Sequence, residues 1–203
     1  MSNKLSRGLT PLQLIRAARR RILFRFNKIG FYRVDVLALQ RVHVANLPTQ
    51  VIPAHEVHFG DLNNPYLQEA DFEHLRNNPE SWCVVVRSGG STIASNWYLR
   101  GRIHIPEVSR TIEHPPGAHY SCRTYVEPSF RGRRLKSHMD TCYVEAVRDC
   151  TYLTGAIYHW NTSSIRAVVN AGWRRTGTLW SCRILGVTFG NTVELPSAEP
   201  VSR

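Results

Sequence analysis

Two stretches of this sequence carry residue types that suit the binding of an anionic ligand. The first is the run VEPSFRGRRLK at residues 126–136, in which a proline is followed by an arginine–glycine turn. The second begins 25 residues later with Asn161–Ser164 (NTSS) and continues to Gly172 and Trp173. A strand that leads through such a turn into a helix aims backbone N–H groups at a phosphate. The first stretch therefore predicts a site for a phosphate-bearing ligand.

The patterns around these stretches predict the elements that position them. From residue 118 onward they indicate a strand at 118–126, a helix at 131–152, a strand at 155–160, a short helix at 163–170 and closing strands within 175–189. Upstream they indicate a strand at 31–39, a helix from about 64 to 77, and two strands at 82–87 and 92–99 joined by the hairpin signal SGGS. Antiparallel hairpins followed by one late parallel crossover predict an α/β fold with a mixed central sheet and helices on both faces. Residues 40–64 and 100–117 carry no interpretable motif.

The charge and cysteine content bound the class of protein. The net charge is +11, but residues 1–30 hold eight Lys and Arg and no acid, so the basicity belongs mostly to this segment. The five cysteines form no Cys-x-x-Cys pair, which argues against a disulfide framework or a zinc site and favours a reducing, cytoplasmic compartment. His55 and His58 lack the spacing of a helical zinc motif. We therefore expect no metal.

The amino-terminal segment is predicted to be an extension of the main domain. Thr10 and Pro11 suit a helix start, and apolar residues then recur at helical spacing, which predicts a basic amphipathic helix at 11–27. Residues 1–30 would form this extension, 31–190 the main domain and 191–203 a disordered tail. The helix could be a solvated or partner-facing arm, a peripheral membrane contact or a cleaved targeting segment. We do not expect nucleic acid as its partner, because proteins that bind single strands interleave aromatic with basic residues.

At this point the chain resembles the GNAT superfamily of N-acyltransferases. Members share a strand ending Val-x-Pro, then Arg/Gln-x-x-Gly-x-Gly/Ala opening a helix, then Asn-x-x-Ser/Ala and, eight residues after the Ser, Gly-Phe or Gly-Trp. The positions that fit in order and spacing are Val126, Pro128, Arg131, Asn161, Ser164, Gly172 and Trp173. The resemblance covers residues 80–190, and residues 31–80 by element order. It implies transfer of an acetyl or longer acyl group from acyl-coenzyme A to a primary amine, by direct attack in a ternary complex.

The resemblance also implies where the cofactor binds. The strand at 118–126 would splay from the strand at 155–160, and the pantetheine arm would fill the gap like an added strand. The pyrophosphate would lie on the amides of 131–136, while Asn161 would bind near the thiol end, cap the short helix, or do both. The implied cofactor-binding residues are Thr124, Tyr125, Val126, Arg131, Gly132, Arg133, Arg134, Leu135, Lys136, Asn161 and Ser164.

Three positions depart from the family pattern. Arg134 and Lys136 stand where the loop normally has Gly and Gly/Ala, so their side chains either crowd the ligand or bring charge to its phosphates. Val168 stands where many members place a tyrosine that protonates the leaving thiolate. The acid must then come from another group or from solvent.

Three residues are candidates for proton transfer. Strand alternation puts Tyr120, with Cys122, on the same face as Thr124 and Val126. Tyr158 and His159 lie on the neighbouring predicted strand. Each could hold a water that takes the amine proton, although residues at such positions more often serve ordinary strand packing.

Two alternatives stay open. The donor could be an acyl carrier protein, whose phosphopantetheine lacks the adenosine pyrophosphate and would not need the two missing glycines. The domain could instead be non-catalytic, sensing coenzyme A and docking partners or a membrane through residues 1–30. The acceptor, a small-molecule or protein amine, and the oligomeric state are not readable from the sequence.

Overall fold

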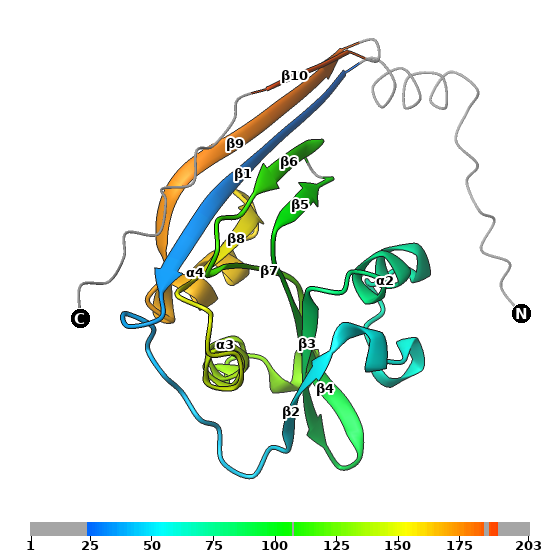
Figure 1. The fold of residues 1–203 in the computed structure, drawn as a ribbon, viewed down its shortest axis with the longest axis vertical. Coiled ribbons are helices and arrows are strands. Elements are labelled where there is room, and N and C mark those ends of the chain that lie inside the picture. The colour runs from blue at the N-terminus through cyan, green and yellow to red at the C-terminus, as the bar shows by residue number, and fades with distance from the viewer. Residues whose placement is uncertain (1–23, 107, 185–186, 191–203) are drawn as a thin grey trace, which may run out of the picture.

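The computed structural model describes residues 24–106, 108–184 and 187–190, and its main feature is one large mixed sheet (Figure 1). In sheet order the eight strands are β10 (Val187–Gly190), β9 (Arg174–Ile184), β1 (Phe24–Asp35), β8 (Tyr152–Tyr158), β7 (Ala118–Val126), β4 (Ser91–Leu99), β3 (Ser81–Ser88) and β2 (Thr49–Pro53). Among these described strands only β7 and β8 pair in parallel. Two further strands, β5 (Arg102–Ile105) and β6 (Arg110–Glu113), form a separate hairpin.

Helices cover both faces of the sheet, as the sequence predicted. One face carries α3 (Leu135–Ala146) and α4 (Thr162–Asn170), and the other carries α2 (Glu69–Arg76) with the β5–β6 hairpin. Short 3-10 turns lie at η1 (Ala54–Glu56), η2 (Phe59–Asp61) and η3 (Pro128–Phe130). The α/β fold class is therefore confirmed.

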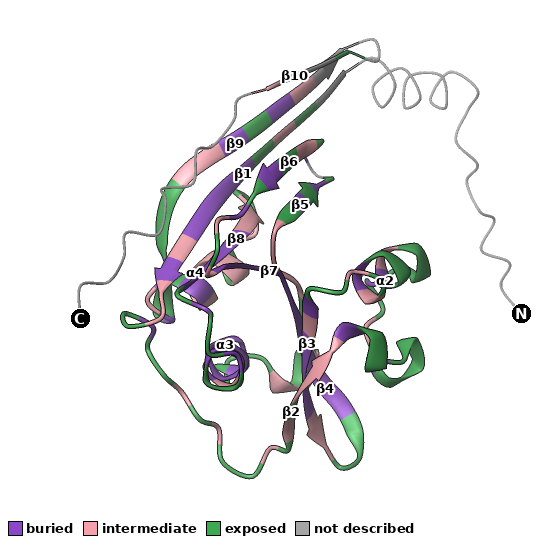
Figure 2. Cartoon of the chain, viewed as in Figure 1, coloured by how far each residue is buried: buried purple, intermediate pink, exposed green. Residues whose placement is uncertain are grey.

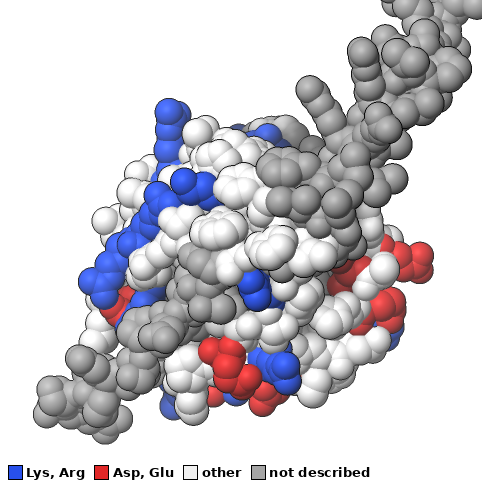
Figure 3. Space-filling view, turned by 90° about the horizontal axis from the view of Figure 1, so that it is seen from above, with Lys and Arg blue, Asp and Glu red and all other residues white. Residues whose placement is uncertain are grey.

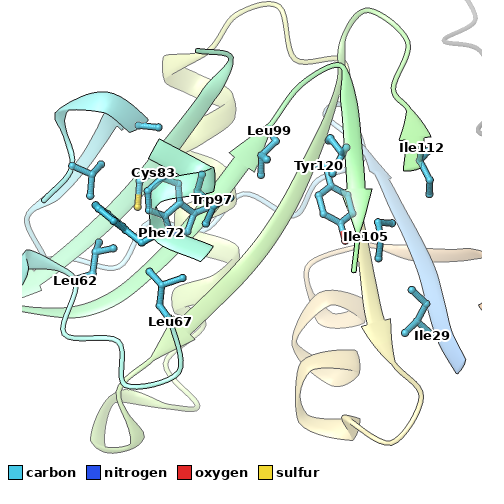
Figure 4. Close-up of a cluster of buried hydrophobic side chains, with 14 of the residues drawn as sticks. Ile29, Leu62, Leu67, Phe72, Cys83, Trp97, Leu99, Ile105, Ile112 and Tyr120 are labelled. Carbon is cyan, nitrogen blue, oxygen red and sulfur yellow. The ribbon is translucent and has the colours of Figure 1, made fainter. Parts of the chain in front are cut away.

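Each face of the sheet has its own apolar core. On the α2 side, Phe72 packs edge-on against Trp97 with ring centroids 6.0 Å apart, and Tyr120 belongs to the same cluster (Figure 4). On the α3 side, Tyr98 of β4 stacks on Tyr143 of α3 with centroids 3.8 Å apart. Buried positions accordingly run along β4 and α3 (Figure 2). The sheet is therefore covered by packed apolar side chains on both faces.

The predicted β3–β4 hairpin is confirmed. Its turn has Gly89 at φ 57° and Gly90 at φ 84°. Two successive residues with positive φ form the primed turn whose twist matches that of the flanking strands, and glycine adopts this conformation without strain.

The amino-terminal boundary differs from the prediction. β1 begins at Phe24, so residues 24–27 extend a strand where a helix at 11–27 was expected, and the strand crosses the predicted boundary at residue 30. The reason is tertiary pairing: β1 lies between β8 and β9 and buries Ile29 and Phe31. The rest of the predicted helix (11–23) and the predicted tail (191–203) lie outside the described residues.

The predicted helix at 131–152 is also shorter in the structure. It begins only at Leu135, because the preceding residue, Arg134, has a left-handed backbone (φ 60°, ψ 25°). It ends at Ala146, and Val147 returns to an extended conformation. The predicted range thus combined three separate elements: the loop before α3, the helix itself and the turn that leads into β8.

Strands β2, β5 and β6 lie in the two segments that carried no readable motif.

Charge is mixed over the described surface. Figure 3 shows one face, on which basic side chains gather on one side while acidic and basic side chains lie together along the lower and right edges. Across residues 24–106, 108–184 and 187–190, no helix combines the length and apolar character that crossing a bilayer requires.

Candidate functional site

The strands β7 and β8 separate along their length. They pair at three register positions, from Ala118 opposite Tyr152 to Tyr120 opposite Thr154. Beyond these positions β7 continues to Val126 and β8 to Tyr158 without further ladder pairing between them in the described structure. Each strand keeps its outer neighbour, because β4 pairs with β7 and β1 pairs with β8. The predicted splay is therefore present, with two firmly held edges facing each other.

A bulge interrupts β7 within this opening. Ser95 pairs with Tyr125 and Trp97 pairs with Cys122, so the single residue Asn96 lies opposite Arg123 and Thr124. Arg123 has φ 51°, and an extra residue of this kind bends a strand and re-aims the side chains that follow.

The bulge corrects the predicted alternation. Cys122 packs toward the α2 side of the sheet and Val126 toward the α3 side. Tyr120 also belongs to the α2-side core. Tyr120 and Cys122 therefore do not share a face with Val126, contrary to the expectation from a regular strand, because the additional residue shifts the period of two by one.

The amino terminus of α3 meets the mouth of this opening. The loop before it turns through two left-handed residues, Gly132 at φ 78° and Arg134 at φ 60°. Arg134 thus keeps the backbone conformation that favours the glycine of the family pattern. No side chain of the described residues caps α3, and its first turn contains no acid. The first-turn N–H groups of α3 are therefore available to an anion, at the positive end of the helix dipole.

The opening is part of a cleft of about 1680 Å³. Every predicted cofactor-binding residue except Arg133 lines this cleft. The guanidinium of Arg133 instead lies 4.9 Å from the ring centre of Phe130. Arg131 donates from Nε to the carbonyl oxygen of Val126 at 3.2 Å, which ties the loop to the end of β7. The structure therefore brings together two stretches of sequence that are 25 residues apart.

The helix α4 closes the far side of the cleft. Asn161 caps it, since its Oδ1 accepts from the Ser164 N–H at 3.2 Å and from the Ser163 hydroxyl at 3.0 Å. The capping role is thus confirmed, and Asn161 and Ser164 line the cleft as well. Val168 is buried and lines the cleft too, so the family's tyrosine position carries an apolar side chain at this wall.

The three proton-transfer candidates fall in different places. Tyr120 lines the cleft but is only 6% exposed, and its ring lies 5.6 Å from that of His114. Tyr158 lines the cleft and stacks on Trp160 with centroids 5.0 Å apart. His159 follows the end of β8 and turns toward β1, where its Nδ1 lies 3.1 Å from the carbonyl oxygen of Lys28. The strand β8 ends at Tyr158, and His159, one residue later, does not line the cleft.

A buried polar network, which the sequence patterns do not predict, lies where the two strands part. Lys136 Nζ lies 2.5 Å from Asp140 Oδ1 and 3.1 Å from Ser121 Oγ. Ser121 follows the last β7 residue paired to β8, and its Oγ also accepts from Asn96 Nδ2 at 2.9 Å. The ammonium therefore turns down the helix into the cleft instead of toward the helix start. One sequence signal existed, namely the i,i+4 spacing of Lys136 and Asp140 on a predicted helix.

Asp140 is completely buried, and the network continues through it. Its Oδ1 also accepts from the Tyr98 hydroxyl at 2.7 Å. Burial is the main cause that raises the pKa of Tyr98 far above its usual value, with Asp140 adding to it, so Tyr98 stays a hydrogen-bond donor. Lys136 lies 4.8 Å above the ring of Trp173 as well. The cleft thus has a positively charged group at its floor.

Two buried histidines flank the paired part of β7 and β8. His114 Nε2 lies 2.9 Å from the Thr154 hydroxyl, and His119 Nδ1 lies 2.8 Å from the Tyr143 hydroxyl. The pKa of each imidazole is lowered to about 4, mainly by burial, and for His119 the nearby Arg100 contributes to this shift. Both are neutral at pH 7 and serve as structural hydrogen-bonding groups.

Solved structures share this overall fold. A tandem GNAT protein from the clavulanic acid biosynthesis pathway superimposes with a TM-score of 0.53 at 12% identity, over 92% of this chain and 62% of that one. A GCN5-related N-acetyltransferase from Kribbella flavida gives 0.50 at 13% identity, over 85% and 62%. An acetyltransferase from the GNAT family of Colwellia psychrerythraea gives 0.50 at 12% identity, over 84% and 61%. The chain has the GNAT fold.

The GNAT fold is what these likenesses establish. The chain spans about three fifths of the length of each of these three solved structures, and identities of 12–13% carry the fold without the substrate. No protein-family model matches the sequence, and no curated protein matches it. The activity must therefore be argued from the site.

Proposed function

We propose that this chain is an acyltransferase that moves an acyl group, most simply acetyl, from acyl-coenzyme A to a primary amine. The observation that carries the proposal is the opening between β7 and β8, which leads directly to the uncapped amino terminus of α3. Coenzyme A has an extended pantetheine arm with amides, which would match the opening, and a pyrophosphate at the end of that arm, which would match the helix terminus.

The pantetheine arm would occupy the opening. Past Tyr120 and Thr154 the two strands no longer pair with each other, although each is fixed by its outer neighbour. An extended ligand can add to such an edge through main-chain hydrogen bonds, as an additional strand does. The thiol end would then lie where the strands meet, beside Ser121.

The pyrophosphate would lie on the first turn of α3. Its N–H groups are uncapped by any described side chain, and Arg131 and Arg134 line the same mouth of the cleft. Backbone amides at a helix start and arginine side chains both favour an anion. The left-handed Arg134 places its backbone as the family's glycine would be placed, and its side chain is exposed.

Transfer would proceed by direct attack of the neutral amine on the thioester. Orientation of the two reactants supplies much of the rate. The amine proton would leave through a water held near Tyr120 or Tyr158, which line the cleft. The acyl-bearing carbon would form its new bond to nitrogen while its bond to sulfur breaks.

The departing thiolate would take its proton from Lys136. Val168 at the cleft wall has no hydroxyl to give a proton. The ammonium beside Ser121 is an N–H donor that lies at the point where the strands part. Its N–H bond breaks as the S–H bond of coenzyme A forms, and solvent returns a proton to the amine. Asp140 would hold the lysine Nζ in place before and after the transfer.

Calorimetric titration with acetyl-coenzyme A and desulfo-coenzyme A tests the donor. We expect micromolar binding of both, weakened at least tenfold by Arg131→Ala, with Arg133→Ala as a matched control outside the cleft. Absence of binding at millimolar ligand would overturn the proposal. Transfer from acylated carrier protein in that event would redirect it to the carrier-protein donor.

A screen of amines with detection of free thiol tests the transfer step. Once an acceptor is found, the variant Lys136→Met/Asp140→Asn removes the ammonium without leaving a buried charge. We expect its kcat to fall about 100-fold, as for the loss of a general acid, with the affinity for desulfo-coenzyme A changed less than threefold. An unchanged kcat would rule out Lys136 as the acid while leaving the acyltransferase proposal intact.

A further inference from the structure

A second cluster of reactive side chains lies on the opposite side of α3 from the cleft floor. His138 and Cys142 are one turn apart on this helix, and His43 comes from the segment that joins β1 to β2. One potential ligand atom of each residue lies within 4.8 Å of the other two. We propose that these three residues bind a divalent transition metal, with Zn²⁺ as the natural occupant.

The donor set suits zinc. Two imidazoles and one thiolate are soft-to-borderline ligands that Zn²⁺ binds in tetrahedral sites. With Zn–S about 2.3 Å and Zn–N about 2.0–2.1 Å, the tetrahedral angle puts sulfur and nitrogen about 3.5 Å apart. Cys142 Sγ lies 3.7 Å from His138 Nδ1, so the two helical ligands are already close to this spacing.

Hydrogen bonds select the ligating nitrogen of His138. The Thr49 hydroxyl donates to the Leu47 carbonyl oxygen at 3.0 Å, so it accepts from His138 Nε2–H at 2.8 Å. With the proton on Nε2, the free lone pair is on Nδ1, the nearer of the two ring nitrogens to Cys142 Sγ at 3.7 Å against 3.9 Å. Two backbone groups compete there, the Val44 N–H and the Val42 carbonyl oxygen, each 3.3 Å from Nδ1, the long end of a hydrogen bond, and a metal would displace both. Zinc-bound imidazoles are held in this way by a second partner on the other nitrogen.

His43 completes the set from the surface. Its side chain is 61% exposed, so it can move the short distance that coordination needs without disturbing the core. Its Nε2 lies 3.3 Å from Glu145 Oε1, and the same oxygen accepts a hydrogen bond from Arg41 Nη1 at 3.1 Å. The carboxylate would orient the ring and leave Nδ1 of His43 for the metal. The fourth position would be open to water.

The site would join the β1–β2 segment to the helix that carries the proposed donor loop. His138 lies three residues after Leu135, the first residue of α3. The metal would thus brace the start of this helix from the side away from the ligand. This inference stands on its own residues and does not depend on the acyltransferase proposal.

Metal titration of the tag-free full chain tests the site. We expect calorimetry to give one equivalent of Zn²⁺ bound at micromolar Kd or tighter, with a rise in Tm. Co²⁺ should give the intense visible bands of a tetrahedral site and a near-ultraviolet thiolate-to-metal charge-transfer band. His43→Ala and Cys142→Ser should each weaken Zn²⁺ binding at least tenfold, and Cys142→Ser should abolish the charge-transfer band.

Two matched controls separate this site from adventitious binding. His55 is an exposed histidine and Cys182 a partly exposed cysteine, both outside the cluster. His55→Ala and Cys182→Ser should bind Zn²⁺ as the unsubstituted protein does. Binding weaker than millimolar, or equal binding by His43→Ala, Cys142→Ser and the unsubstituted chain, would overturn the inference.

Discussion

The ion pair at the floor of the cleft makes a quantitative prediction. The carboxylate of Asp140 is fully buried, and its Oδ1 is held by Lys136 Nζ at 2.5 Å and by the Tyr98 hydroxyl at 2.7 Å. Its Oδ2 has no hydrogen-bond partner within the described part of the chain. In Lys136→Met the carboxylate would keep one neutral donor. Removing one partner of a buried pair costs about 3–5 kcal/mol, a large share of the about 5–15 kcal/mol that keeps a domain folded.

The partner substitution should cost less. In Asp140→Asn the lysine side chain, 10% exposed and lining the cleft, keeps Ser121 and the face of Trp173. We expect a loss of about 2 kcal/mol, the scale of one hydrogen bond to a charged group. The double variant leaves no buried charge, so it should be little less stable than Asp140→Asn alone, which gives a coupling energy close to the Lys136→Met loss, about 3–5 kcal/mol.

Urea unfolding followed by circular dichroism measures all three variants. The free energy of unfolding in water and the m value come from linear extrapolation, and an unchanged m value shows that the unfolding transition is comparable. If Lys136→Met costs less than about 1 kcal/mol, or if the two single losses simply add, the ion pair is not the buried, coupled group described above.

Three further predictions concern the protonation of two buried histidines and the left-handed backbone at two other residues. His114 and His119 have pKa values lowered to about 4 by burial, against about 6.5 when unfolded, so stability should be constant above pH 6.5 and fall between pH 6.5 and 4 by up to about 3 kcal/mol for each. Urea titrations at stepped pH check this, and a flat profile in that window would contradict it. Arg134→Gly should raise the free energy of unfolding by about 0.5–1 kcal/mol, because φ at this residue is 60°. Arg133→Gly is the control: this residue has no positive φ, so the substitution should lower the free energy of unfolding by a similar amount. Thermal unfolding compares the two variants. Gly172→Ala should lose at least about 2 kcal/mol, since φ is 91° and a Cβ would lie 2.9 Å from a loop carbonyl oxygen; a loss under 0.5 kcal/mol would refute this.

The late βαβα unit was predictable because its signals are local. Pro128 ends a strand, and Asn161 and Gly172 begin and end a helix, so their chemistry fixes the boundaries within a few residues. The β3–β4 turn is equally local, since two glycines in sequence specify it. Features of this kind depend on the residues themselves and not on what they pack against.

The remaining features depend on distant partners. At the bulge, the single residue Asn96 of β4 lies opposite two residues of β7, Arg123 and Thr124. β7 contains no glycine that would mark this position in the sequence. The ammonium of Lys136 is turned inward by Asp140, whose burial depends on packing against Tyr98. Asn96 and Thr124 are 28 residues apart along the chain and Tyr98 and Asp140 are 42 apart, so periodicity cannot report these contacts.

The position of β1 in the sheet sets the order in which the protein can be assembled. β1 pairs only with β8 and β9 among the described strands, and its partners lie more than 115 residues further along the chain. The strands β2, β3, β4 and β7 can meanwhile pair with neighbours nearer in sequence. Ile29 and Phe31 must therefore stay exposed on a nascent chain until β8 and β9 have been synthesised, which makes closure of the sheet a late, non-local event. Pulsed hydrogen exchange during refolding should find β3 and β4 amides protected before those of β1; simultaneous protection would argue for a single concerted step.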